Sequence, residues 1–356
     1  MSGLAGCVRD FFGTRIPVGT DDVSFPGSRV WFAAPADPRT FGPMDLRPLG
    51  RTGLRVSVVG FGGSPLGGAF RPVTQEAANA AVRAALDAGI NFFDTAPYYG
   101  ATAAESALGR ALREIPRENF VLATKVGRYG HGPEGFDFSG ERTARSVDES
   151  LARLRCDYLD LVQVHDIEFG FLAQVWNETL PALDRLRQTG KVRHLGITGF
   201  PLAALQRVRE QAPALVEVVL SYCHGTLQDG TFRPWATELR TAKVGTLNAA
   251  PLAMGLLTRA SMPAWHPASP ALRTACAAAA DYCVRRGADL AELALQHSFG
   301  LAEMDCTVVG LGSADEVSRA VKCVGRTPDP ELLEGVRALL APVQGATWPS
   351  GRPENN

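Results

Sequence analysis

The sequence predicts an α/β fold, a closed (β/α)8 TIM barrel in which eight parallel strands alternate with helices. Short apolar runs typical of buried strands alternate with longer segments of helical periodicity, and this order indicates a parallel sheet. Eight such strand-helix units follow one another between residues 56 and 324. That number of units in one stretch of this length is typical of the closed barrel.

Residues 45–350 are expected to form this single barrel domain, and residues 1–43 an N-terminal extension. The extension is rich in Gly, Pro and Arg without sustained periodicity, so we expect it to be disordered. Its four arginines are spread as in a targeting peptide, but four aspartates balance them, and transit peptides are poor in acids. A non-essential extension is the leading interpretation, with organelle targeting left open.

Residues 46–56 carry turn residues at their centre and are typical of a β-hairpin. The first barrel strand is expected at 56–61, and a helix at Gln75–Ala88 that ends before Gly89, a residue suited to a helix C-cap. The remaining strands are expected at residues 90–94, 120–125, 159–165, 192–198, 216–221, 245–250 and 307–309. The remaining helices are expected at residues 103–113, 141–154, 173–189, 202–210, 232–241, 272–286, 290–299 and 315–324.

The composition of the 356 residues fits a soluble enzyme and argues against several other classes. A hydrophobic share of 46% is enough for a sizeable core, and a net charge of -1 gives no reason to expect nucleic acid or an anionic membrane as partner. No apolar run approaches membrane-spanning length. The seven cysteines are scattered and never spaced C-x-x-C, which indicates reduced thiols in the cytoplasm and no structural zinc or other metal.

Titratable residues follow three consecutive predicted strands at their carboxyl ends. Asp94 ends one strand and Tyr99 lies in the loop beyond it, Lys125 ends the next strand, and His165 the third. The carboxyl ends of barrel strands share one face, so these side chains can meet in one pocket. A phenol, with a pKa of roughly 10, needs a cation beside it to carry protons near pH 7. Each residue alone has an ordinary explanation, such as a cap or a core histidine, but the set indicates a catalytic centre.

The spacing Asp94-x-x-x-x-Tyr99, the strand end Ala-Thr-Lys125 and the strand end Val-His165-Asp resemble the catalytic tetrad of the aldo-keto reductases. The resemblance runs from about residue 46 to 348 and is closest to the plant branch of the family that oxidises L-galactose. Segments 61–67, 165–169, 221–224, 251–257, 265–270 and 347–351 carry this narrower likeness. It implies that the hairpin plugs the amino end of the barrel. It also implies that Tyr99 is the general base, aided by Lys125 and Asp94, while His165 orients the sugar oxygen.

A cofactor site is expected late in the chain, where barrel enzymes commonly bind phosphate groups. Residues 309–313 form a glycine-containing loop before a helix, and free helix-start amides suit an anion, although a plain loop-to-helix join has the same pattern. The resemblance implies that this is the adenosine end of a nicotinamide cofactor. The residues implied to contact the cofactor are Gly62, Gly63, Thr198, Ser221, Pro251, Leu252, Gly255, Gly310, Ser313 and Glu316.

NAD is expected rather than NADP. Relatives that prefer NADP hold its 2′-phosphate with Lys and Arg on this loop and helix, whereas this chain has Leu311, Asp315 and Glu316 there. An acid accepts hydrogen bonds from a ribose hydroxyl and repels a phosphate. Arg319 and Lys322 lie a turn or more further on and leave residual NADP use open.

The expected partner is a small sugar, L-galactose, oxidised at C1 to L-galactono-1,4-lactone as in ascorbate biosynthesis. Candidate substrate contacts are Tyr98, His165, Asp166, His224 and Trp265. Ala96 and the loop 225–230 depart from the plant pattern and leave D-threo-aldoses, L-fucose, D-arabinose and pyridoxal open as substrates. Gly199 stands where many members of the family have an asparagine beside the carboxamide, a feature shared with the galactose-oxidising branch. We expect a monomer or a weak homodimer.

Two other classes of protein are weighed against this interpretation. The glycines Gly60–Gly63 superficially resemble a Rossmann loop, but no helix pattern begins before Thr74, as such a loop requires. A non-catalytic barrel that binds a nicotinamide nucleotide is the second alternative, and substitution of Tyr99 separates it from an enzyme.

Overall fold

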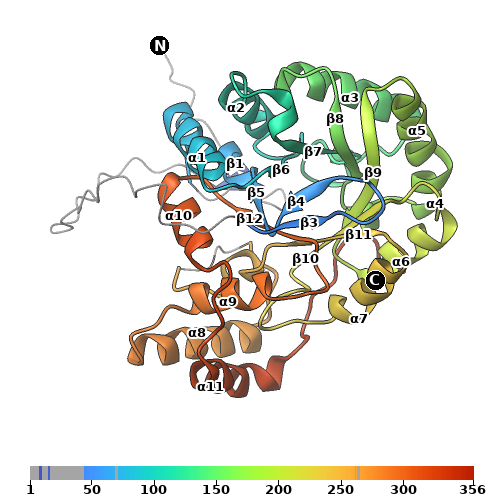
Figure 1. Ribbon diagram of the computed structural model, residues 1–356. Coiled ribbons are helices and arrows are strands. Elements are labelled where there is room, and N and C mark those ends of the chain that lie inside the picture. The colour runs from blue at the N-terminus through green and yellow to red at the C-terminus, as the bar shows by residue number, and fades with distance from the viewer. Residues whose placement is uncertain (1–7, 10–14, 17–43, 69–70, 261, 263–264) are drawn as a thin grey trace, which may run out of the picture.

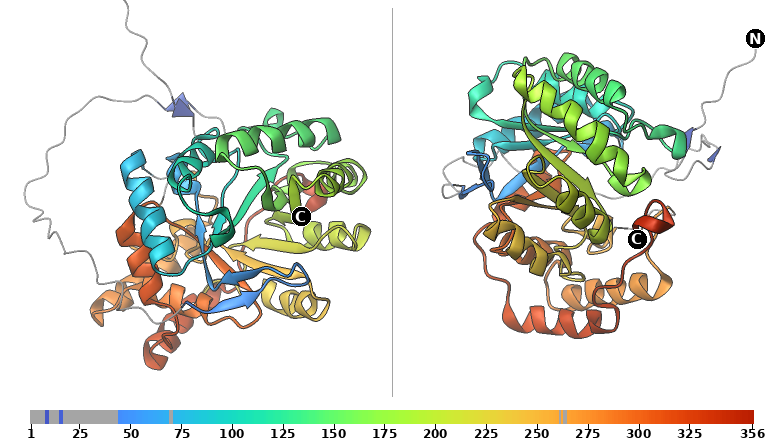
Figure 2. Two further views of the ribbon diagram at one scale, coloured as in Figure 1. Left: turned by 45° about the horizontal axis from the view of Figure 1, so that its top comes forward. Right: turned by 90° about the vertical axis from the view of Figure 1, so that its right-hand side faces the viewer.

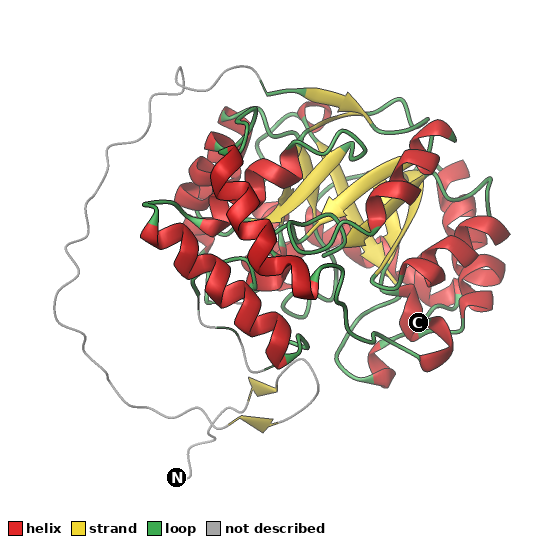
Figure 3. Ribbon diagram, turned by 90° about the horizontal axis from the view of Figure 1, so that it is seen from below, coloured by secondary structure: helices red, strands yellow, loops and turns green. Residues whose placement is uncertain are grey.

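The computed structural model of the chain describes residues 8–9, 15–16, 44–68, 71–260, 262 and 265–356. Eight parallel strands close into a barrel in the spatial order β10-β11-β12-β5-β6-β7-β8-β9, with helices around it (Figures 1 and 3). The predicted (β/α)8 fold is therefore confirmed. The barrel strands are β5 (Val59–Gly62), β6 (Phe92–Asp94), β7 (Val121–Val126), β8 (Leu159–Val164), β9 (Val192–Gly199), β10 (Val218–Tyr222), β11 (Gly245–Ala249) and β12 (Cys306–Gly310).

Most of the helices surround the barrel because they bury an apolar face against the strands. Hydroxyl or carboxylate caps begin six of the described helices, as Thr74 Oγ1 does by accepting from Ala77 N at 3.2 Å. The helices are α1 (Gln75–Asp87), α2 (Ala103–Ala111), α3 (Gly140–Leu154), α4 (Leu172–Gln174), α5 (Leu180–Gln188), α6 (Leu202–Gln211), α7 (Phe232–Thr241), α8 (Pro270–Arg285), α9 (Leu290–Phe299), α10 (Ala314–Lys322) and α11 (Pro330–Leu340).

Three differences from the predicted elements have local causes. A π-helical turn at Val175–Thr179 separates α4 from α5, where one continuous helix was expected. Val56 belongs to the hairpin, so the first barrel strand begins at Val59. Helix α11 was not predicted, although Asp329 caps it and a proline occupies its first turn.

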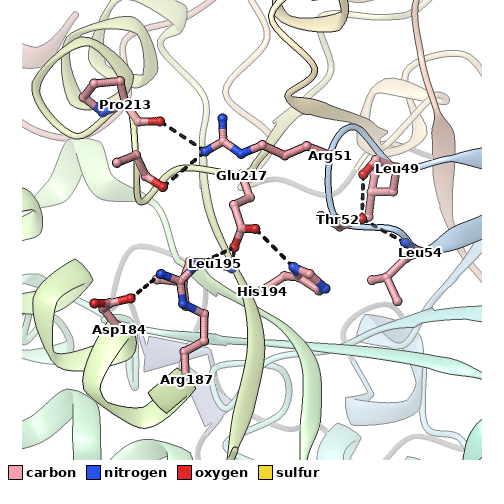
Figure 4. Close-up of polar contacts among 11 residues, drawn as sticks. Leu49, Arg51, Thr52, Leu54, Asp184, Arg187, His194, Leu195, Pro213 and Glu217 are labelled. Carbon is pink, nitrogen blue, oxygen red and sulfur yellow. Dashed lines mark hydrogen bonds and ion pairs between the residues drawn. The ribbon is translucent and has the colours of Figure 1, made fainter.

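The hairpin of β3 (Leu46–Pro48) and β4 (Arg55–Ser57) closes the amino end of the barrel, as the resemblance implied. Leu49 and Val56 are fully buried and pack with the interior side chains of the strands. Each such buried side chain contributes about 1.5–3 kcal/mol. Arg51, at the turn, donates to the carbonyl oxygens of Pro213 and Ala214, both at 3.2 Å (Figure 4).

A buried carboxylate ties together the strands and a helix at this same end (Figure 4). Glu217 accepts from the backbone N–H of Leu195 at 3.1 Å and from Arg187 at 3.4 Å, and lies 3.2 Å from His194 Nδ1. Its charge is thus paired within the fold. This end of the molecule is built for stability, which leaves the opposite end for the site.

The C-terminal residues return to the barrel beside α6, at the opposite, carboxyl end of the strands (Figures 1 and 2). Arg352 N donates to the backbone oxygen of Glu168 at 2.9 Å, and Asn355 Nδ2 donates to it at 2.8 Å. Outside the barrel, α8 and α11 pack against each other around a second apolar cluster. The last residues therefore form part of the wall around the strand ends.

The predicted disorder of residues 1–43 concerns mostly residues outside those described and stays a prediction. Of that stretch, Val8–Arg9 and Arg15–Ile16 pair as a short antiparallel ribbon. Within the described residues, no helix has the length and apolarity to cross a membrane, and no group of three or more His, Cys, Asp or Glu side chains could hold a metal. The six cysteines that the structure describes are free thiols.

Candidate active site

The four residues of the predicted tetrad come from three adjacent strands. Asp94 ends β6, Lys125 lies in β7, and His165 follows β8 directly. These strands are hydrogen-bonded neighbours in the barrel, so their tips lie side by side. Tyr99 is brought back to them by the loop after β6, so that its ring lies beside both Lys125 and His165.

Lys125 and Asp94 form a buried ion pair. Lys125 Nζ lies 2.5 Å from Asp94 Oδ1 and donates to the backbone oxygen of Thr95 at 2.8 Å. Gln163 donates to the second carboxylate oxygen of Asp94 at 2.9 Å. Burial alone would lower the pKa of Lys125, but the charges of Asp94 and Tyr99 outweigh it, and the pKa lies above its ordinary value. The ammonium is therefore charged at neutral pH.

Tyr99 lies against this ammonium. Lys125 Nζ is 4.9 Å from the centroid of the Tyr99 ring. Burial raises the pKa of the phenol, while the charge of Lys125 and its hydrogen bond to Tyr99 oppose that rise. The predicted juxtaposition is present, but in the protein alone burial prevails and Tyr99 keeps its proton at neutral pH.

His165 completes the cluster with its ring 5.6 Å from that of Tyr99, edge to face at 89°. Burial lowers the pKa of His165 to about 3, so the imidazole is neutral. Its Nε2 lies 3.6 Å from Asp166 Oδ2, whereas the buried Nδ1 has no hydrogen-bond partner in the structure. A neutral imidazole can donate one hydrogen bond and accept another, which suits an alcohol or carbonyl oxygen.

Close backbone packing fixes the loop that carries Tyr99. A Cβ added to Gly100 would lie 2.1 Å from the oxygen of Gly67, and one added to Gly67 would lie 2.6 Å from the oxygen of Tyr99. Gly100 also has a positive φ of +61°, which glycine adopts without strain. Both glycines are therefore required for the loops after β5 and β6 to meet.

A second buried ion pair lies beside His165. Arg128 Nη1 and Asp166 Oδ2 are 2.5 Å apart, and the guanidinium carbon lies 3.6 Å from the centroid of the Tyr98 ring. Asp166 has a φ of +50°, a strained backbone conformation for a residue other than glycine, which is common at functional sites. Tyr98 also lies within hydrogen-bonding distance of His131 Nδ1, at 3.3 Å. Arg128 was not predicted, although it lies three residues beyond Lys125 at the same strand end.

The chain matches known proteins over most of its length. Residues 58–338 match the model of the aldo/keto reductase family. The chain belongs to the aldo-keto reductase family. It is 48% identical to L-galactose dehydrogenase of Arabidopsis thaliana over 319 residues, which cover 88% of this chain and 99% of that protein. It is 35% identical to D-arabinose 1-dehydrogenase of Saccharomyces cerevisiae over 295 residues, 76% of this chain and 87% of the relative.

A solved structure agrees with this family assignment. The holo form of aldo-keto reductase AKR11C1 from Bacillus halodurans superposes with a TM-score of 0.70 at 27% identity, covering 87% of this chain and 99% of that chain. Both the family model and this likeness support the same barrel and the same class of enzyme. Members of this family are oxidoreductases that bind a nicotinamide cofactor.

The strand ends of this aldo-keto reductase offer a fit for such a cofactor. Thr198 and Ser221 are the last residues but one of β9 and β10 and are almost fully buried, and Ser221 Oγ has no hydrogen-bond partner in the structure. In the loop after β11, which holds Pro251 and Leu252, three residues other than glycine have positive φ, and Gly255 follows with φ +106°. Strained backbone of this kind is common where a loop holds a ligand.

The region around the start of α10, predicted to bind the adenosine end of the cofactor, is held together by contacts of Glu316. Ser313 caps the helix by accepting from Glu316 N at 3.3 Å, and the Glu316 carboxylate accepts from Gly312 N at 2.7 Å. The other carboxylate oxygen lies 2.7 Å from Arg71 Nη2, across the loop after β5. A helix-start amide expected to be free for an anion is thus occupied by the protein's own carboxylate.

Other predicted residues have structural roles that need no ligand. A Cβ on Gly62 would lie 2.9 Å from the oxygen of Val309, and a Cβ on Gly63 would lie 3.1 Å from that of Asp94, so both glycines permit close strand packing. Gly310 likewise leaves room for Pro65, which a Cβ would approach to 3.3 Å. Contacts of these glycines with a cofactor stay predictions.

The predicted sugar contacts His224 and Trp265 both have partners within the protein. Both ring nitrogens of His224 are engaged, one 2.8 Å from Asp229 Oδ2 and the other 2.9 Å from the oxygen of Phe200. The imidazole thus connects the loop after β10 with the start of the loop after β9. Trp265 stacks on His266 with ring centroids 6.0 Å apart. Direct sugar contact by either residue stays a prediction.

Proposed function

We propose that the protein oxidises L-galactose at C1 to L-galactono-1,4-lactone with NAD as the hydride acceptor, as in ascorbate biosynthesis. The buried Asp94–Lys125 pair beside Tyr99 is the observation that carries the proposal. The similarity to the Arabidopsis L-galactose dehydrogenase over nearly its full length supports L-galactose as the sugar. A monomer or weak homodimer in the cytoplasm stays the expectation for its state.

Oxidation of the sugar at C1 removes a hydride from carbon and a proton from the hydroxyl oxygen. The oxidised nicotinamide, when bound, takes the hydride and brings a positive charge to the site. Tyr99 takes the hydroxyl proton as general base. Moving a phenol pKa from 10 to 7 requires about 4 kcal/mol of differential stabilisation, and the ammonium of Lys125 contributes part of it. Asp94 holds that ammonium charged and in place.

His165 orients the substrate by hydrogen-bonding the oxygen at C1. Its depressed pKa keeps the imidazole neutral, so it directs the oxygen without competing with Tyr99 for the proton. Asp166 and Arg128 stand directly behind it and hold that wall of the site through their ion pair. Tyr98, stacked on Arg128, presents its ring on the same side and contacts the sugar.

NAD is proposed over NADP because Glu316 occupies the adenosine end. Its carboxylate covers the Gly312 amide and neutralises Arg71, the two groups that would otherwise attract a 2′-phosphate. A carboxylate there repels a phosphate and accepts from ribose hydroxyls. Similarity to the D-arabinose dehydrogenase of yeast supports D-arabinose as the second candidate substrate. L-Fucose, D-threo-aldoses and pyridoxal are further ones.

Absorbance at the reduced nicotinamide band tests the proposal. Purified protein is assayed with NAD and L-galactose, L-fucose, D-arabinose or pyridoxal, and with NADP under the same conditions. We expect the highest kcat/KM with L-galactose and NAD. A higher kcat/KM with D-arabinose overturns the substrate, a preference for NADP overturns the cofactor, and turnover of none of them overturns the enzyme.

A further inference from the structure

One carboxylate oxygen, Asp166 Oδ2, lies between Arg128 and His165. Arg128 Nη1 is 2.5 Å from this oxygen, whereas His165 Nε2 is 3.6 Å from it. The first distance is that of a charge-assisted hydrogen bond, and the second is too long for any hydrogen bond. A histidine beside a buried carboxylate often donates to it. Here Arg128 has taken the oxygen that His165 would use.

Aromatic rings hold Arg128 in the place that this contact requires. The side chain is buried, and its guanidinium carbon lies 3.6 Å from the centroid of the Tyr98 ring. The same carbon lies 5.2 Å from the centroid of Phe136 and 5.6 Å from that of Phe169, two rings that stack on each other. A cation is attracted to aromatic faces most strongly when it is out of water. The guanidinium is therefore fixed by more than its ion pair with Asp166.

His165 is poorly placed to carry a second proton. An imidazolium donates from both ring nitrogens, and the buried Nδ1 has no hydrogen-bond partner among the described residues. Burial lowers the pKa of His165 to about 3, and the charge of Asp166 opposes this fall. The charges of Lys125 and Arg128 deepen it. The neutrality of His165 thus depends on how the charge of Asp166 is compensated.

Of the groups around this contact, Arg128 is the one bound to Asp166. Lys125 is bound to Asp94 instead. Burial raises the pKa of Glu168 to about 8 and raises the pKa values of the three nearby tyrosines, so these groups keep their protons at neutral pH. The titratable groups that surround His165 and Asp166 are Glu168 on the same turn, Tyr98 and Tyr99 on the loop after β6, Lys125 on β7, Arg128 on the loop after β7 and Tyr222 on β10.

We propose that Arg128 is a positioning residue for His165. By holding Asp166 Oδ2, it keeps Asp166 from binding the imidazole and so leaves Nε2 to the oxygen at C1 of the sugar. A histidine paired with a carboxylate is also a stronger base and would compete with Tyr99 for the hydroxyl proton. Arg128 thus keeps orientation and proton removal on two different residues. This inference rests on the proposed function, because the sugar oxygen is part of it.

Proton NMR of the imidazole C–H groups tests the first half of the proposal, because it follows His165 without any turnover. The full-length wild type is titrated beside Arg128→Met and the double variant Arg128→Met with Asp166→Asn, and the His165 signal is assigned by its loss in His165→Gln. We expect the proton affinity of His165 to increase about 10- to 1000-fold in Arg128→Met, the effect of one opposite charge at this range. In the double variant it should return to that of the wild type, because asparagine carries no charge.

Kinetics with L-galactose and NAD test the second half. We expect kcat/KM to fall roughly tenfold in Arg128→Met, the size of one hydrogen bond to the sugar oxygen, while the Kd of NAD is unchanged. The double variant should recover most of the loss. Arg128→Lys, which keeps the charge, should remain closer to the wild type than Arg128→Met in both kcat/KM and the proton affinity of His165.

Arg193→Met is the matched control. Arg193 also pairs with an aspartate, Asp160, at 3.1 Å, and its guanidinium carbon lies 3.7 Å from the centroid of the Tyr158 ring. It stands near the amino end of β9, away from the tetrad. The substitution removes the same kind of contact, so we expect a wild-type proton affinity of His165 and a wild-type kcat/KM.

An unchanged proton affinity of His165 in Arg128→Met overturns the proposal, whatever the loss of turnover, because that loss would then be structural. A gain in proton affinity that persists in the double variant also overturns it, because the carboxylate would not be its cause. Where Arg128→Met does not fold, Arg128→Gln takes its place. Its amide can still donate to Asp166 but carries no charge, so a smaller gain in the same direction is expected. A wild type whose His165 titrates as expected while no sugar is turned over would contradict the proposed function instead.

Discussion

The two ends of the proposed cofactor site differ in how their charges are held. At the reacting end, Lys125 and Asp94 are only 1% and 3% exposed. At the adenosine end, the ion pair of Arg71 and Glu316 has side chains 57% and 28% exposed. Buried charges depend on their partners for stability, whereas exposed pairs contribute little. The chemistry is therefore hard to change without damage to the fold, and the choice of cofactor is easy to change.

Substitution Lys125→Met should give the largest effect. It leaves Asp94 buried without its counter-charge, which costs about 3–5 kcal/mol of unfolding free energy, and it removes turnover. Urea denaturation and a rate assay measure the two losses. The double variant Asp94→Asn with Lys125→Met should recover most of the stability and none of the turnover. Unchanged stability of the single variant would contradict a buried charged pair.

Substitution Gly100→Ala should give a smaller loss that falls on the site. Left-handed backbone costs a non-glycine residue roughly 1–2 kcal/mol, and the new Cβ would also collide with Gly67 and displace Tyr99. Gly190→Ala is the matched control, because Gly190 has φ +81° with nothing within 4 Å of an added Cβ. Both variants should lose stability in thermal unfolding, but Gly100→Ala alone should lower kcat. Equal kcat values in the two variants would show that the packing of Gly100 on Gly67 does not position Tyr99.

The pH profile of oxidation tests the protonation states of the buried residues Tyr99 and His165. Burial raises the pKa of Tyr99, so the fraction able to accept a proton, and with it kcat/KM, should rise as pH increases from 6 to 9. Because the pKa of His165 is lowered to about 3, its protonation should add no limb near pH 6.5. A profile that falls above neutral pH, or breaks near 6.5, speaks against these assignments.

Substitution Glu316→Gln should give the smallest effect, confined to cofactor choice. Removal of the exposed charge leaves Arg71 without its counter-charge, so the Kd of NADP should fall a few-fold, while stability changes by no more than about 1 kcal/mol. In a variant that already carries Arg71→Ala, Glu316→Gln should improve NADP affinity less than it does in the wild type. Fluorescence titration with NAD and NADP measures the two Kd values. An unaltered NADP affinity would show that Glu316 does not determine cofactor selectivity.

The sequence was sufficient to predict the barrel and the meeting of Asp94, Lys125 and His165 at neighbouring strand ends, because both follow from local patterns. Strand and helix periodicity give the eight units, and the rule that catalytic groups follow strand ends brings Asp94, Lys125 and His165 together. The same rule, applied three residues beyond Lys125, could have found Arg128. Its partner Asp166 lies 38 residues away, and only the fold shows that the two meet.

Properties that depend on burial were beyond the sequence. The direction of the Tyr99 pKa is set by desolvation, which no spacing of residues displays. Glu168 resembles an ordinary loop acid in sequence, and only the fold shows that its side chain is fully buried beside Gly199. Helix α11 packs mainly on α8, outside the repeating units, so the eight-fold pattern did not call for it.

The most direct test of the central claim is the turnover of Tyr99→Phe with L-galactose and NAD, alongside its affinity for NAD. The phenol is the proposed proton acceptor, and general-base catalysis is typically worth 10²–10⁴-fold. We expect kcat to fall within or beyond that range while the Kd of NAD stays within about twofold of wild type. Normal turnover by Tyr99→Phe would show that another group takes the proton and would contradict the account.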